Sequence, residues 1–361
     1  MERTNLPLRV GFRTNSLSDE RLRYVKQLGV EDVFVNPVEP VGGTGGDVFE
    51  DESDRTESDR RLRLGPDHVP SVEELEELVA ACEANGVRLA GVHSLGYNVY
   101  GAIKFGREGA EKQASAIEEL IRNMGAAGID ILGYQWNPRG VVPMRTGTEP
   151  IRGGARGTAF HLAELEQPDA IALDREYTEE ELWENYEAFL ERILPVAEEA
   201  GVTLALHPID PPGVTESVRE ERGVDDIESF GGIPRLFRSV ENFRRAMDAV
   251  PSDNHGLKLC LGCFSEMGED VIEVIREFGE HDKIVFVHFR DVVGTSESFH
   301  ETFVDCGNFD ELAAIRALRE VGFSGVVIPD HVPHMEGDTD WGHRARGFTA
   351  GYLRGLIRAT E

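Results

Sequence analysis

Short apolar runs alternate with amphipathic segments along the whole chain, and this alternation limits the fold more than any other feature. The predicted strands lie at 8–14, 31–37, 87–94, 130–138, 202–208, 256–264, 284–291 and 324–331. The predicted helices lie at 17–29, 71–86, 107–127, 178–201, 240–250, 269–279, 309–321 and 343–359. Repeated strand-helix units give parallel strands joined by crossover helices. Eight units predict a closed (β/α)₈ barrel, the TIM barrel, with its site at the carboxyl ends of the strands.

A doubly wound open sheet is the competing fold. It is disfavoured because no G-x-G-x-x-G sequence follows the first predicted strand. We expect one TIM-barrel domain over residues 1–361. Long insertions at the carboxyl-end face are expected at about 38–70, 138–178 and 210–238, because these ranges show no clear apolar period.

Four consecutive predicted strands end in residue types that bind metals. His207 lies near the end of VTLALHP, Cys260 in GLKLCLGCF, and His288 in KIVFVHFRD. Asp330 lies near the end of GVVIPDH. Any one of these is more often a buried core residue than a ligand. Because all four occupy equivalent strand ends, they predict one shared metal site.

Further polar residues follow earlier strands and are candidates for substrate contact. His93 lies near the tip of the third strand, and Trp136 lies in a polar and aromatic cluster after the fourth. Arg145 opens an Arg- and Gly-rich stretch that could form a lid and present arginine to an anion. The alternative interpretation of this stretch is a solvated, flexible loop.

Acidic residues outnumber basic residues by 67 to 37, which gives a net charge of −30, and only five of the basic residues are Lys. In molar salt the Debye length falls to about 3 Å, so such a surface is tolerated there better than in dilute buffer. The composition therefore predicts a salt-adapted, halophilic protein. It also disfavours nucleic-acid binding through a broad basic face.

The four cysteines, at 82, 260, 263 and 306, are too few for a disulfide framework. The N-terminal MERTNLPLR has no apolar leader, and no apolar run approaches the ~20 residues that span a bilayer. We therefore expect a cytoplasmic protein that binds no membrane. The Cys260-x-x-Cys263 spacing is typical of redox dithiols, but here it is expected across a strand end rather than at a helix start.

The motifs LALHPIDPP, FVHFRDV, SFHE and PDHVPHMEGD follow one another in the second half of the chain. From about Leu204 to Ile357 the sequence resembles the mannonate dehydratase family, within the broader xylose isomerase-like barrels. Upstream, IRNMGAAGIDILGYQWNPRGVVPMRT resembles the fourth unit of that family. The first three strands match more loosely.

The resemblance implies that one divalent metal, Mn²⁺ or else Fe²⁺, is bound by His207, Cys260, His288 and Asp330. It implies that His331 transfers a proton and that the protein dehydrates a six-carbon aldonate to a 2-keto-3-deoxy acid. Asp210 is expected as a further catalytic group, with Arg290 and His300 around the substrate. A metal would stabilise the charge that develops during loss of the C2 proton and the C3 hydroxyl.

One departure from the family lies after the Asp330-His331 pair. The family carries a catalytic Tyr some fifteen residues later, and Gly347 stands at the corresponding position here. His343 is the candidate replacement, because an imidazole can donate a proton near neutral pH whereas Trp341 can only donate a hydrogen bond. His343 could equally lie in the first turn of the last helix, facing solvent.

Three other functions remain open at this level. A sugar isomerase or epimerase could use the same barrel and metal. A metal-dependent phosphodiesterase acting on damaged DNA would need more carboxylates and a basic channel. A non-catalytic sugar-acid sensor is the third. We expect a small sugar acid as the ligand and a homo-oligomer, dimer or tetramer, as the assembly.

Overall fold

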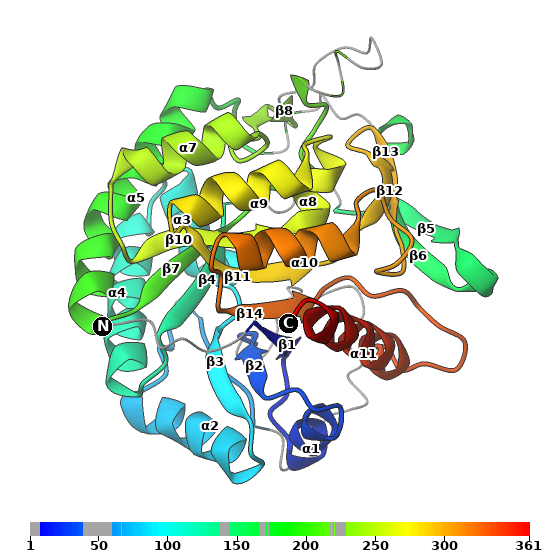
Figure 1. Cartoon of the computed structure of the whole chain (residues 1–361). Coiled ribbons are helices and arrows are strands. Elements are labelled where there is room, and N and C mark those ends of the chain that lie inside the picture. Colours follow the sequence, from blue (N-terminus) through cyan, green and yellow to red (C-terminus); the bar gives the residue numbers. More distant parts are fainter. Residues whose placement is uncertain are drawn as a thin grey trace.

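Eight parallel strands close into one barrel in the computed structural model (Figure 1). The structure describes residues 8–38, 60–65, 67–136, 144–165, 171, 173–216, 218, 220 and 229–361. The barrel strands are β1 (Arg9–Thr14), β2 (Asp32–Val35), β3 (Arg88–Val92), β4 (Ile131–Gln135), β7 (Thr203–His207), β10 (His255–Cys260), β11 (Ile284–Phe289) and β14 (Val326–Pro329). Around the ring their order is β1, β14, β11, β10, β7, β4, β3 and β2. The closed ring confirms the predicted TIM barrel and rules out an open sheet.

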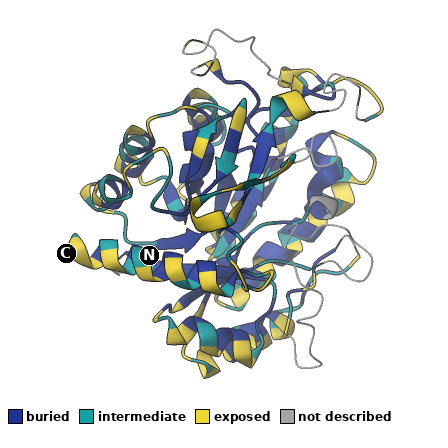
Figure 2. Cartoon of the chain, turned by 90° about the vertical axis from the view of Figure 1, so that its right-hand side faces the viewer, coloured by how far each residue is buried: buried dark blue, intermediate teal, exposed yellow. Residues whose placement is uncertain are grey.

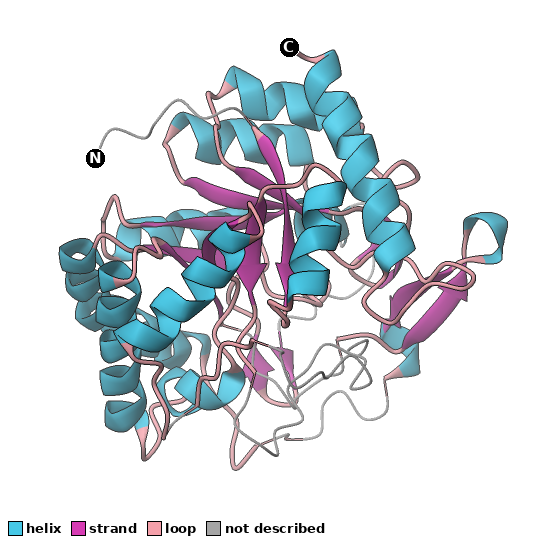
Figure 3. Cartoon of the chain, turned by 90° about the horizontal axis from the view of Figure 1, so that it is seen from below, coloured by secondary structure: helices cyan, strands magenta, loops and turns pink. Residues whose placement is uncertain are grey.

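Helices surround the ring, so the strands are buried on both faces (Figures 2 and 3). They are α1 (Asp19–Gln27), α2 (Val72–Ala84), α3 (Tyr97–Lys104), α4 (Ala110–Ala126), α5 (Glu179–Ala200), α7 (Val240–Ala249), α8 (Leu261–Glu266), α9 (Val271–Glu280), α10 (Glu311–Glu320) and α11 (His343–Ala359). Local sequence sets their ends. Capping boxes pair Ser71 with Glu74 at the start of α2 and Thr178 with Glu181 at the start of α5. None of the described helices is long and apolar enough to cross a membrane.

The barrel interior is filled by side chains from alternate positions of the strands. A buried cluster contains Phe34, Ala90, Ala205, Phe286, Val326 and Ile328. The rings of Phe34 and Phe286 stack with their centroids 4.5 Å apart. Because strand side chains alternate in direction, residues two positions beyond Ala205, Phe286 and Ile328 also point inward, one layer nearer the carboxyl ends. This cluster is therefore the floor of the predicted site.

The insertions contain structure that the sequence did not predict. In the 138–178 insertion, β5 (Gly147–Pro150) and β6 (Arg156–His161) form a hairpin, with short 3₁₀ turns at Arg152–Gly154 and Leu162–Glu164. This hairpin joins β13 (Ser298–Glu301) and β12 (Val292–Thr295) in a four-stranded sheet beside the barrel (Figure 1). In the 210–238 insertion, β8 (Ser229–Phe230) pairs with β9 (Ile233–Pro234). Most of 38–70 lies outside the described residues.

Two predicted boundaries need correction. The run 256–264 is not a strand throughout, because β10 ends at Cys260 and α8 begins at Leu261. The Cys260-x-x-Cys263 pair therefore does stand at a helix start, with Cys260 as the N-cap residue. The predicted helix at 107–127 is α4, and it is preceded by α3, which the sequence analysis missed because it spans only eight residues.

Candidate metal centre and active site

The four predicted ligands lie at the carboxyl ends of neighbouring barrel strands. His207 and Cys260 are the last residues of β7 and β10, and Asp330 directly follows β14. One ligand atom each from His207, Cys260 and His288 lies within 4.8 Å of the other two. Nδ1 of His288 lies 3.1 Å from Oδ2 of Asp330. The barrel therefore brings all four side chains together, as the spacing along the sequence predicted.

The charge states of these residues suit a cation. His207 Nδ1 donates to the Pro208 carbonyl oxygen at 2.7 Å, and its buried Nε2 has no hydrogen-bond partner among the described residues. Burial lowers the pKa of His207 to about 4, so the imidazole is neutral. Burial alone would raise the pKa of Cys260, but a hydrogen bond from Cys263 and the charge of Arg290 lower it well below its usual value. A neutral imidazole with an unused nitrogen beside a thiolate fits a metal ligand set.

Asp330 is held from the neighbouring strand β1 by a residue that the sequence analysis missed. Arg13, next to last in β1, donates from Nε to Asp330 Oδ1 at 2.6 Å. Burial alone would raise the pKa of Asp330, but the charges of His331, His288 and Arg13 keep it well below its usual value. The carboxylate is therefore ionised, and Arg13 fixes one of its two oxygens.

His331 lies beside this cluster in an unusual backbone conformation, with φ at +43°. Its Nδ1 lies 2.7 Å from Oε1 of the buried Glu301. Burial alone would lower the pKa of His331, but the carboxylates of Asp330 and Glu301 raise it. The side chain keeps 18% of its surface exposed, whereas Glu301 keeps 1%. A strained, partly exposed imidazole next to a ligand set suits proton transfer.

Arg290 is buried, and both of its terminal nitrogens donate to acceptors that belong to the protein. It donates to Glu266 at 2.6 Å, to Asp210 at 3.0 Å and to the Cys263 sulfur at 3.2 Å. Those three acceptors form a second group whose ligand atoms lie within 4.8 Å of one another. Because Arg290 donates to all three and Arg145 also donates to Asp210, this second group is held together by arginines of the protein. The sequence analysis missed Glu266 and Cys263 as members of the site.

Arg145 and Asp210 also bind each other. Arg145 reaches Asp210 with two hydrogen bonds, of 2.6 and 3.0 Å, and bonds to Glu301 as well. Burial would raise the pKa of Asp210, but Arg145 and Arg290 lower it. Asp210 is therefore an ionised acceptor for two arginines. These contacts place Arg145, Arg290 and Asp210 in one buried network around His331.

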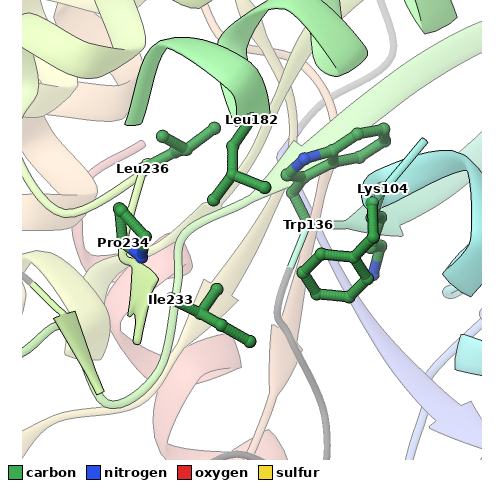
Figure 4. Close-up of a pocket in the computed structure, with 7 residues that line it drawn as sticks. Lys104, Trp136, Leu182, Ile233, Pro234 and Leu236 are labelled. Atoms are coloured by element: carbon green, nitrogen blue, oxygen red, sulfur yellow. The ribbon is translucent and has the colours of Figure 1, made fainter. Parts of the chain in front are cut away.

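The other predicted substrate contacts are more dispersed. His93 stacks on His288, with ring centroids 4.9 Å apart and Nε2 atoms 2.8 Å apart. His300 lies on β13, and its Nδ1 is 3.2 Å from Glu149 of β5. Trp136 is buried against Tyr186. It lines a small, mainly apolar pocket together with Lys104, Phe105, Leu182, Ile233, Pro234 and Leu236 (Figure 4).

His343 is the first residue of α11, and its partners include Thr339, Tyr24 and Trp341. None of these three partners belongs to the predicted site. A Cβ added at Gly347 would lie 3.1 Å from the Tyr24 hydroxyl, so a side chain there would extend toward α1. These contacts give no support to His343 as the second acid or base, which stays a prediction.

The closed barrel and the cluster of His, Cys and Asp at adjoining strand ends define a TIM-barrel protein with a candidate metal centre. A family model described as D-mannonate dehydratase (UxuA) matches residues 159–361. The mannonate dehydratase of Thermotoga neapolitana is 30% identical over 320 residues, covering 79% of this chain and 82% of that protein. The mannonate dehydratase of Oceanobacillus iheyensis is 28% identical over 320 residues, covering 80% and 86%. The chain belongs to the D-mannonate dehydratase family, a family of hydro-lyases.

Solved structures agree with this assignment. The crystal structure of mannonate dehydratase from Streptococcus suis serotype 2 matches with a TM-score of 0.79 at 25% identity, covering 98% of this chain and 94% of that one. D-psicose 3-epimerase from Clostridium cellulolyticum H10 matches with a TM-score of 0.57 at 13% identity, covering 98% and 99%. The second similarity shows a shared fold alone.

Proposed function

We propose that this protein dehydrates D-mannonate, or a closely related aldonate, to 2-keto-3-deoxy-gluconate and water. The convergence of His207, Cys260 and His288 with Asp330, directly beside His331, is the observation that carries the proposal. Membership of a family named for this reaction agrees with it. In the reaction the C2 proton is removed, the C3–O bond breaks, and the hydroxide leaves as water. The resulting enol takes up a proton at C3 and becomes the ketone.

We infer that His207, Cys260, His288 and Asp330 hold one divalent cation, Mn²⁺ or else Fe²⁺. Mixed imidazole, thiolate and carboxylate ligands are compatible with either ion. When bound, the cation would supply positive charge near the substrate carboxylate and the anion that develops at C2. Arg13 would keep the Asp330 carboxylate oriented, and His93 would do the same for the His288 ring.

His331 is the residue to which we assign proton transfer. Its partly exposed ring and its fixed Nδ1 support this role, because Nδ1 is held by Glu301 while Nε2 lies on the side of the proposed ligands, 3.6 Å from Asp330 Oδ2. Asp210, Arg145 and Arg290 would build the charged wall of the site through their mutual bonds. His300 and Trp136 are retained as proposed substrate contacts.

Product analysis tests the proposed reaction. The purified, Mn²⁺-loaded protein is incubated with D-mannonate and its epimers, and the products are separated by chromatography. A 2-keto-3-deoxy acid supports dehydration. A ketose or epimer of unchanged composition would instead indicate an isomerase or epimerase.

The surface and assembly form a second part of the proposal. The excess of acidic over basic residues supports a salt-adapted protein from a halophile. A cytoplasmic location and a homo-oligomer, dimer or tetramer, are our proposals from the sequence. Light scattering of the purified protein in molar KCl measures the assembly directly.

A further inference from the structure

We propose that the hairpin β5–β6 of the 138–178 insertion is a positioning device for His331, and that Glu301 is the positioning residue through which it acts. The inference rests on the proposed role of His331 in proton transfer. It assigns a purpose to an insertion whose sequence suggested only a lid or a solvated loop. Three sets of contacts support it, at Glu301, along the hairpin and in the chain after His331.

Glu301 is the last residue of β13, and its carboxylate accepts a hydrogen bond from His331 Nδ1 at 2.7 Å. This bond fixes the rotation of the ring, with Nδ1 toward Glu301 and Nε2 toward Asp330, whose Oδ2 lies 3.6 Å away. Arg145 also lies 3.2 Å from Nδ1. Arg290 donates to both oxygens of Glu301, at 3.0 and 3.1 Å, and Arg145 donates to Oε1. Charge-assisted bonds from two guanidinium groups hold the carboxylate in one orientation.

The hairpin fixes the backbone that carries Glu301. Strand β6 pairs antiparallel with β13, with Phe160 opposite Phe299 and Ala159 opposite His300. A Cβ added at Gly157 of β6 would lie 1.9 Å from the Glu301 carbonyl oxygen. The two backbones therefore touch at Glu301, and only a residue without a side chain fits at 157.

The same strand is joined to the segment that follows His331. Arg156 and His334 exchange two backbone hydrogen bonds, of 3.0 and 2.8 Å. A buried cluster of Phe160, Phe230, Val292 and Phe299 anchors the sheet. Strand β6 thus contacts both Glu301 and the chain three residues beyond His331. It sets the distance between the carboxylate and the imidazole.

The hairpin offers a matched pair of substitutions. Gly157→Ala forces a methyl group against the Glu301 carbonyl, whereas Gly147→Ala, in the same hairpin, adds a methyl group with no atom of the described residues within 4 Å. Neither residue is in contact with the proposed metal ligands. We expect Gly157→Ala to lower kcat on D-mannonate by about 10- to 100-fold, as for other partners that orient active-site side chains. Its KM and metal content should stay near those of Gly147→Ala.

Glu301 is tested directly with Glu301→Gln and Glu301→Asp, and Glu297→Gln removes a partly exposed carboxylate from the same β12–β13 hairpin as a control. Glu301→Gln should lower kcat at least as much as Gly157→Ala, with KM little changed. Glu301→Asp should recover part of the loss, because it restores a carboxylate. If Glu301 had only a structural role, these substitutions would lower metal content and stability in step with kcat.

A spectroscopic measurement separates this inference from the proposed reaction. With ¹⁵N-labelled histidine, the His331 ring should show a protonated, hydrogen-bonded Nδ1 in the wild type and in Gly147→Ala. That signal should shift in Gly157→Ala and in Glu301→Gln. Unchanged His331 signals in both variants would overturn the inference even if the protein dehydrates aldonates. Shifted signals in these variants, with a wild type that turns over no aldonate, would support the positioning device and refute only the reaction.

Discussion

Arg13 Nε lies 2.6 Å from Asp330 Oδ1, although the two residues are 317 positions apart in the chain. Closure of the barrel between β1 and β14 brings them together. The second oxygen of Asp330, Oδ2, lies on the side of His288, 3.1 Å from its Nδ1. One oxygen of the proposed ligand is thus fixed by an arginine, while the other faces the remaining ligands.

Replacing Arg13 should weaken metal binding. We predict that Arg13→Met raises the Kd for Mn²⁺ by about 10- to 100-fold, because the Asp330 carboxylate loses the bond that orients it. The control is Arg9→Met, which removes an arginine at the other end of β1 whose partner is Asp32. Isothermal titration of the metal-free protein measures both. Equal Kd values for the wild type and Arg13→Met would refute the orienting role.

Acid should destabilise the fold through His255. Burial lowers its pKa to about 3, below the value of about 6.5 for an unfolded chain. As pH falls below 6.5 the unfolded state takes up a proton that the folded state does not, so stability is lost down to about pH 3. We expect the wild type to lose about 1 kcal/mol more than His255→Phe between pH 6 and pH 5, measured by urea unfolding. The control is His281→Phe, which changes an exposed histidine and should lose as much stability between pH 6 and pH 5 as the wild type. The same loss of stability in His255→Phe as in the wild type would contradict this account.

Stability should rise with salt. A net charge of −30 repels itself in dilute buffer, and molar KCl screens that repulsion. We predict that the melting temperature increases steadily from dilute to molar KCl. Scanning calorimetry across that range measures it. A melting temperature independent of KCl would remove the halophilic interpretation.

The second acid or base is tested with His343→Phe on D-mannonate. If His343 replaces the family's tyrosine, kcat should fall with KM nearly unchanged. Its contacts with Thr339, Tyr24 and Trp341 instead indicate a role in fixing the start of α11. A lower melting temperature with full activity in His343→Phe would assign His343 that structural role and remove it from the proposed mechanism.

The sequence predicted the barrel and the meeting of the four ligands for one physical reason. Side chains alternate along a strand, so His207, His288 and Asp330 take the same inward direction as Ala205, Phe286 and Ile328. Parallel strands then bring their carboxyl ends to one face. Both features depend on local pattern, which a single sequence displays.

Other parts of the site depend on contacts that no local pattern reveals. Glu301 and Arg13 meet their partners only after the chain has closed, 30 and 317 positions away. Strands β5 and β6 are short, and each is stabilised by pairing with its neighbours, β6 with both β5 and β13. The resemblance placed Arg290 around the substrate, and its bonds to Glu266, Glu301 and Asp210 are likewise contacts that no local pattern reveals.

The central claim is that four strand-end residues hold a metal while His331 transfers a proton during aldonate dehydration. The most direct measurement combines metal content with formation of 2-keto-3-deoxy-gluconate from D-mannonate, for the wild type, Cys260→Ser and His331→Asn. We predict one metal ion per chain and product in the wild type, loss of both in Cys260→Ser, and retained metal without turnover in His331→Asn. Full turnover in His331→Asn, or metal binding unchanged in Cys260→Ser, would contradict the account.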